Sequence, residues 1–136
     1  MAAPLKSIGP SLSYIQLMRS QDNRKWQDSL SNSSVPSILK LDKDSIHCLK
    51  DGLYFIYAQV TFSEVLQENQ DKSVILTRYA DGKSNKVLVE GTLPHTTHGS
   101  LWVAKIVKLR QGDNISINIT SDFRTDSTFW GVYQLQ

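Results

Sequence analysis

The chain is built from short stretches in which every second residue is apolar. In NISINIT, residues 114–120, three isoleucines alternate with asparagine, serine and threonine. Successive side chains of a β-strand point to opposite faces of its sheet, so this period of two predicts a strand with one buried and one solvated face. No segment shows a persuasive 3.6-residue apolar period with helix caps, so the pattern predicts no long helix.

Similar stretches, separated by turn residues, recur along nearly the whole sequence. We expect strands over 11–19, 37–41, 45–49, 53–62, 73–79, 86–93, 101–109, 114–120 and 128–135. Asp51-Gly52 and Asp81-Gly82 are turn signals, and polar loops are expected at 20–25, 30–37, 63–72 and 94–100. About ten short antiparallel strands predict an all-β sandwich, barrel or jelly roll.

Three predicted strands have apolar residues on both faces. In 53–62, for example, Ile56, Ala58 and Val60 oppose Phe55 and Tyr57. One sandwich has one interior, so a second apolar set is left outside it. The aromatic members of that set are Phe55, Tyr57, Trp102, Phe129 and Tyr133.

Such a face needs a cover, because leaving each aromatic in water forgoes roughly 1.5–3 kcal/mol. Either a long loop or helix of the same chain covers the face, or another copy of the chain does. The sequence has no spare helix, and a large apolar patch on a globular domain usually marks an interface, which favours a second copy.

Composition and charge narrow the class of protein. The chain has 136 residues, 40% hydrophobic and 21% charged, which suits one globular domain with its own core. We expect a flexible lead-in at 1–10 and a single domain at 11–136. The net charge of +2 and the lack of a basic block with interleaved aromatics exclude a nucleic-acid partner, and no stretch approaches the ~20 apolar residues of a membrane span.

Catalytic and metal-binding patterns are weak. His95 and His98 lie in a predicted loop without a third ligand nearby, whereas a zinc site needs three or four. His47 falls on a predicted strand, where we expect a structural role, and Cys48, the only cysteine, cannot form an internal disulfide. No nucleophile-elbow or phosphate-loop motif is present. We therefore predict a protein that is not an enzyme and uses no cofactor or metal.

Three glycosylation sequons favour passage through the secretory pathway. They begin at Asn32, Asn114 and Asn118. Asn114 and Asn118 point away from the isoleucine face of their strand, so both are candidate glycosylation sites.

Several of these stretches resemble the tumour necrosis factor ligand family. DGLYFIYAQVTF (51–62) resembles its central strand, LRQGDNISINIT (109–120) a turn and strand, and TFWGVYQL (128–135) its terminal strand, with Trp130 replacing the usual Phe. Trp26 also stands where the family often has Trp. The ordered motifs cover roughly residues 12–135.

The resemblance implies a jelly roll of ten strands that assembles as a homotrimer. Family members are cytokines that bind and cluster cysteine-rich receptors in grooves between subunits, which triggers signalling. They are extracellular, as type II membrane proteins or their shed ectodomains, so we expect a membrane link only through an anchor outside this stretch. The family's axis-facing aromatics correspond to the five residues that the alternation leaves uncovered, which are therefore the predicted trimer interface.

The sequence departs from the family pattern in three ways. The loops around 63–72 and 92–100 lack the cysteines of a common inter-loop disulfide. Lys105 falls in the alternation at a position that faces the core, so it needs a bulge or a sheet edge to reach water. The turn 80–85 is short, as in the T-cell costimulatory ligands, so receptor contacts are expected to depend on charge.

Receptor contacts are expected in loops 19–28, 79–86 and 121–127, with 63–72 and 92–100 as the alternative at the other end of the sandwich. The candidate residues are Arg24, Lys25, Tyr79, Lys83, Lys86 and Arg124. Two other classes remain open at this point. One is the globular head of complement-type trimeric proteins, and the other is a jelly-roll carbohydrate-binding module.

Overall fold

The computed structural model describes residues 12–22, 24–30, 37–63 and 70–136, which form ten strands and one short 3-10 turn. The first five strands are β1 (Tyr14–Arg19), β2 (Trp26–Asp28), β3 (Leu39–Asp42), β4 (Ser45–Cys48) and β5 (Gly52–Thr61). They are followed by β6 (Lys72–Tyr79), β7 (Lys86–Leu93), β8 (Ser100–Leu109), β9 (Asn114–Ile119), the turn η1 (Thr125–Ser127) and β10 (Phe129–Gln134).

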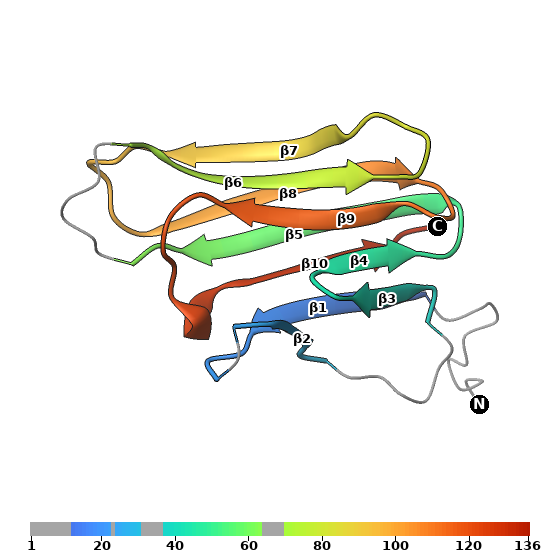
Figure 1. The fold of residues 1–136 in the computed structure, drawn as a ribbon, viewed down its shortest axis with the longest axis horizontal. Helices are drawn as coiled ribbons and strands as arrows, with labels where there is room; N and C mark the ends of the chain where they lie inside the picture. The colour runs from blue at the N-terminus through green and yellow to red at the C-terminus, as the bar shows by residue number, and fades with distance from the viewer. Residues whose placement is uncertain (1–11, 23, 31–36, 64–69) are drawn as a thin grey trace, which may run out of the picture.

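The strands form two five-stranded antiparallel sheets that pack face to face as a jelly roll. Sheet A has the order β2-β1-β10-β5-β8, and sheet B the order β3-β4-β9-β6-β7. In Figure 1, sheet B lies in front and the long strands β5 and β8 run behind β9 and β6. The predicted all-β sandwich of about ten strands is confirmed.

Alternation along the strands determines which side chains enter the core between the sheets. On β5, Ile56, Ala58 and Val60 are fully buried, while Phe55 and Tyr57 point to the outer face and are half-buried. β10 contributes the largest buried side chain, Trp130. The two faces predicted for these strands are thus the two faces observed.

Side-chain hydrogen bonds hold the connection between β8 and β9. The Asp113 carboxylate accepts from the Arg110 amide at 2.8 Å, and Gly112 adopts φ 95°, a left-handed conformation that glycine takes without steric cost. The Asp51 carboxylate accepts from the Gln111 amide at 2.8 Å, which joins this turn to the start of β5.

The nine predicted strands all occur, with β2 and η1 added to them. β2 has three residues and η1 has three, too few to show a period in the sequence. Lys105 reaches solvent because β8 is the edge strand of sheet A; its pairing with β5 runs without a register shift, so no bulge is involved. Cys48 is a buried free thiol whose Sγ lies 3.2 Å from the Lys50 carbonyl oxygen. The predicted lead-in at 1–10 lies outside the described residues.

Candidate interaction surfaces

The outer face of sheet A, here called the aromatic face, bears side chains from β1, β10, β5 and β8. All five predicted interface residues lie on it: Phe55, Tyr57, Trp102, Phe129 and Tyr133. Trp102 is 53% exposed and Tyr133 42%. Within the described residues, no helix or third layer covers this face.

Ring contacts on the aromatic face centre on Tyr57. Its ring centroid lies 5.8 Å from Phe55, 5.8 Å from Trp102 and 6.3 Å from Phe129. These separations fall in the range of favourable offset and edge-on aromatic pairs. The rings therefore pack against one another and form one aromatic cluster.

The face extends further than the predicted interface set. Tyr14 and Met18 of β1 are exposed on it, directly opposite Tyr133 and Phe129 of β10. Ile106 of β8, which sequence alternation had placed on the same side as Trp102, is 55% exposed. The signal for the β1 residues was present in the sequence, because YIQLMR alternates two buried residues with Tyr14 and Met18.

One hydrogen bond crosses the aromatic face. The Tyr57 hydroxyl donates to Gln16 Oε1 at 2.6 Å, passing over β10 at Gly131. A Cβ on Gly131 would lie 2.7 Å from that hydroxyl and would clash with the Ile15 carbonyl oxygen, so only glycine leaves room for this contact. Burial raises the pKa of the Tyr57 phenol, which keeps it protonated as a donor.

The six predicted receptor-binding residues lie at opposite ends of the sandwich. Arg24 and Lys25 are in the β1–β2 turn, and Arg124 precedes η1; both segments lie at the left end in Figure 1. The β6–β7 connection lies at the right end. It holds Lys83, with Tyr79 as the last residue of β6 and Lys86 as the first of β7, and all three are exposed.

The predicted separation of the loops is wrong for two of the three candidate loops. The β1–β2 turn and the segment before η1 lie at the same end of the sandwich as the end of β5 and the β7–β8 connection, and not at the other end from them. The Arg124 amide donates to the Thr61 carbonyl at 2.8 Å, and the Phe62 amide to the Gly99 carbonyl at 3.2 Å. Long-range backbone pairing between β5 and the segment before η1 causes this arrangement, including the bridge between Phe62 and Phe123.

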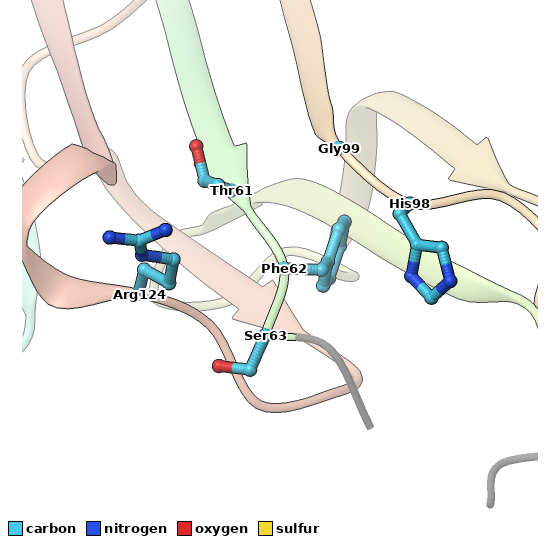
Figure 2. A pocket seen from close by; sticks show the side chains of 6 residues that line it. All are labelled: Thr61, Phe62, Ser63, His98, Gly99 and Arg124. Atoms are coloured by element: carbon cyan, nitrogen blue, oxygen red, sulfur yellow. The ribbon is translucent and has the colours of Figure 1, made fainter. Parts of the chain in front are cut away.

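A hollow of about 520 Å³ opens at this left end. It is lined by Thr61, Phe62, Ser63, His98, Gly99 and Arg124. Figure 2 shows Arg124 on one side of Phe62 and His98 on the other, so the two basic side chains do not converge on one point. The Arg124 guanidinium lies 3.5 Å from the Asp126 carboxylate. The surface here is of mixed charge and is no pocket for a lone anion.

Stacked aromatic rings support the loops at the left end. Trp26 and Phe123 stack with centroids 6.0 Å apart and an interplanar angle of 2°. The Arg19 guanidinium lies 5.0 Å from the Trp26 centroid and 5.5 Å from that of Phe123, within cation–π range of both. This contact ties the β1–β2 turn to the segment that holds Arg124.

The β7–β8 connection is held by Lys72, the first residue of β6, and by Asp71, which precedes it. The Asp71 carboxylate accepts from the His95 amide at 3.1 Å and lies 3.2 Å from His95 Nδ1. The hydrogen bond from the His95 side chain lowers the pKa of Asp71 below its ordinary 3.8. Lys72, only 2% exposed, donates from Nζ to the Thr97 carbonyl at 3.3 Å.

The histidines do not form a metal site in the described part of the chain, where no group of three or more His, Cys, Asp or Glu could hold an ion. His47 has a partner on the neighbouring strand, since its Nδ1 lies 2.7 Å from Asn114 Oδ1. Asn114 and Asn118 both point outward from sheet B, Asn114 half-buried and Asn118 exposed.

Two packed five-stranded antiparallel sheets, one with a partly exposed aromatic outer face, define a jelly-roll protein. A family model described as the TNF (Tumour Necrosis Factor) family matches residues 24–135. The chain therefore belongs to the tumour necrosis factor family.

Curated relatives agree with this assignment. The chain is 28% identical over 122 residues to tumor necrosis factor ligand superfamily member 6 of Sus scrofa, covering 82% of this chain and 43% of the relative. It is 24% identical over 121 residues to CD40 ligand of Gallus gallus, covering 82% and 44%. The chain thus spans less than half the length of these relatives.

Solved structures share the fold. A crystal structure of murine APRIL aligns with a TM-score of 0.74 at 21% identity, covering 92% of this chain and all of that one. Among the described residues, the structure has no helix of the length and apolarity needed to cross a bilayer.

Proposed function

We propose that this chain is the receptor-binding domain of an extracellular cytokine that acts as a homotrimer. In this proposal the trimer binds cysteine-rich ectodomains of the tumour necrosis factor receptor family and clusters them to trigger signalling. Family membership supports the cytokine class over the complement-type head and the carbohydrate-binding module. We propose no enzymatic activity.

The aromatic face is the observation on which the proposal chiefly depends. Its aromatic rings pack against one another, and the side chains of Trp102 and Ile106 are each more than half exposed. A second copy of the chain would remove these side chains from water, at roughly 25 cal/mol for each Å² of apolar surface buried. The family resemblance supplies the number of subunits, three, and the face supplies the surface through which they meet.

Receptor binding is then left to surfaces that the trimer does not use. The ends of the sandwich hold the exposed cationic and aromatic residues of the loops, and a groove between two neighbouring subunits would run along the long axis past both ends. Arg24, Lys25 and Arg124 would contact the receptor near one end, and Tyr79, Lys83 and Lys86 near the other. Carboxylates such as Asp126 lie among the cations, so the pattern of charge would select the partner.

The same proposal implies where the protein acts in the organism. We infer an extracellular site of action, either at the cell surface as a type II membrane protein or as a shed ectodomain.

Two measurements test the proposal. Sedimentation equilibrium at micromolar concentration should give three times the monomer mass of 15.4 kDa, unchanged by reducing agent because Cys48 is buried. A single monomeric species would contradict it. Surface plasmon resonance against a panel of cysteine-rich receptor ectodomains should then yield at least one binder, and a trimer that binds none of a complete panel would refute the receptor assignment while leaving the assembly intact.

A further inference from the structure

The outer face of sheet B is polar along its central strand, in contrast to the aromatic face of sheet A. β9 lies at its centre, between β4 and β6. The outward side chains of β9 are Asn114, Ser116 and Asn118, and those next to them on β4 are Ser45 and His47. Polar groups of this kind are readily solvated.

Two sequons on β9 share this face but differ in their surroundings. Asn118, in Asn118-Ile119-Thr120, is exposed and lies opposite Ile75 of β6. Asn114, in Asn114-Ile115-Ser116, is half-buried. The two asparagines are four residues apart, or about 13 Å along the strand, so each can be judged by its own contacts.

The Asn114 side chain is held at both of its polar atoms. Its Oδ1 lies 2.7 Å from His47 Nδ1, and its Nδ2 faces the Gly112 carbonyl at 3.5 Å. The hydroxyl of its sequon is also engaged, with Ser116 Oγ 2.6 Å from Ser45 Oγ. A glycan on Asn114 Nδ2 would have to leave toward the β8–β9 turn.

Asn114 also lines a hollow of about 370 Å³ on sheet B, beside the β3–β4 turn. Asp42, Lys43 and Tyr79 line the same hollow, and Tyr79 is the cross-strand neighbour of Asn114. A sugar chain at Asn114 would therefore fill the space beside Tyr79, whereas one at Asn118 would project from the middle of the sheet into solvent.

We propose that Asn118 bears the N-linked glycan of this face and that Asn114 stays unmodified in the folded protein. The inference rests on the proposed extracellular location, because only the secretory pathway supplies the donor. There, Asn118 Nδ2 attacks the anomeric carbon of a polyprenyl-diphosphate-linked oligosaccharide. A C–N bond forms, the C–O bond to the diphosphate breaks, and the amide loses one proton as the polyprenyl diphosphate leaves.

A glycan at Asn118 has consequences for docking. It stands on the sheet opposite the aromatic face, so assembly through that face and glycosylation are compatible. It covers the centre of sheet B, which leaves the two ends of the sandwich for a partner. An unmodified Asn114 keeps Tyr79 accessible.

The test is direct mapping of both sites in secreted protein. The full chain would be fused to a cleavable signal peptide and expressed in cultured animal cells, in an Asn32→Gln background so that only the two β9 sequons remain. Enzymatic release of N-glycans in ¹⁸O-water converts each occupied asparagine to labelled aspartate, and peptide mass spectrometry then reads each site. We expect label at Asn118 and none at Asn114.

Matched variants sharpen the result. Asn118→Gln should remove the glycan mass from the secreted protein, and Asn114→Gln should leave it unchanged. Label at Asn114 in folded, secreted material, or an unlabelled Asn118, would overturn the proposal. Because the signal peptide imposes the secretory route, either result would bear on the site alone, while sedimentation and receptor binding of the same material report separately on the proposed function.

Discussion

The Tyr57 hydroxyl donates a 2.6 Å hydrogen bond to Gln16 Oε1, joining β5 to β1 across the intervening strand β10. It places a polar pair in the middle of an aromatic surface. Gly131 makes the contact possible, because a Cβ there would collide with the Tyr57 hydroxyl. If the face is buried in a trimer, both polar atoms leave water together and satisfy each other.

Breaking one half of this pair should weaken the trimer. Tyr57→Phe leaves Gln16 Oε1 buried without its donor, and Gln16→Leu leaves the Tyr57 hydroxyl without its acceptor; each should cost about 1–3 kcal/mol of trimer stability. The double variant Tyr57→Phe/Gln16→Leu should recover most of that loss. Sedimentation equilibrium over a range of concentrations measures the monomer–trimer equilibrium, and losses that simply add would mean that the pair is not buried on assembly.

A carboxylate in the exposed part of the aromatic face should separate assembly from folding. Trp102 is 53% exposed in the isolated chain, so Trp102→Asp should leave a folded monomer. In the trimer it would bury an unpaired charge, which is costly, and the complex should dissociate. Circular dichroism with light scattering reports on both properties.

The matched control is Lys40→Asp, an exposed site on the outer face of β3 in sheet B, which should remain trimeric. A fully stable Trp102→Asp trimer would show that the aromatic face has another role.

The Asp71–His95 contact should be visible in the acid titration of the protein. The pKa of Asp71 is lowered from 3.8, chiefly by the hydrogen bond from the His95 side chain. A lowered pKa means that the folded state favours the carboxylate, so the contact is complete above about pH 3.8 and is lost as the pH falls through the native pKa. NMR titration of the Asp71 carboxyl should give a midpoint below 3.8.

His95→Ala should move that midpoint up toward 3.8. His98→Ala, three residues along the same connection, is the control and should leave it in place. A midpoint insensitive to His95→Ala would show that the two side chains do not interact in solution.

The faces of the strands could be predicted from the sequence because alternation is a local property. The residues of β5 that lie in the core and those on the aromatic face follow directly from the order of Ile56, Tyr57 and Ala58. The same logic assigns Tyr14 and Met18 to the aromatic face, although their strand has only six residues.

The arrangement of the loops could not be predicted, since it depends on contacts between residues far apart in the chain. Arg124 lies beside Thr61 because the segment before η1 pairs with the end of β5, and no local pattern encodes that pairing. Lys72 is a second case. A lysine is expected in solvent, yet this one is buried, with its Nζ hydrogen-bonded to the Thr97 carbonyl and 6.0 Å from the Phe62 ring centroid.

The separation of the charged loops yields the prediction that bears most directly on receptor binding. We expect the triple variant Arg24→Ala/Lys25→Ala/Arg124→Ala, at the left end, to weaken receptor binding at least tenfold, about 1.4 kcal/mol, because exposed Arg side chains are frequent interface anchors. We expect a comparable loss from Tyr79→Ala/Lys83→Ala/Lys86→Ala at the right end, because a groove between subunits passes both ends.

Surface plasmon resonance against the receptor that binds the parent protein measures both losses, with sedimentation confirming that each variant remains a trimer. Lys40→Ala on the outer face of sheet B is the control and should bind like the parent. A loss confined to one triple variant would restrict the receptor to that end of the groove. Unchanged affinity in both would exclude these loops and direct attention to the β7–β8 connection, where His98→Ala is the next variant to measure.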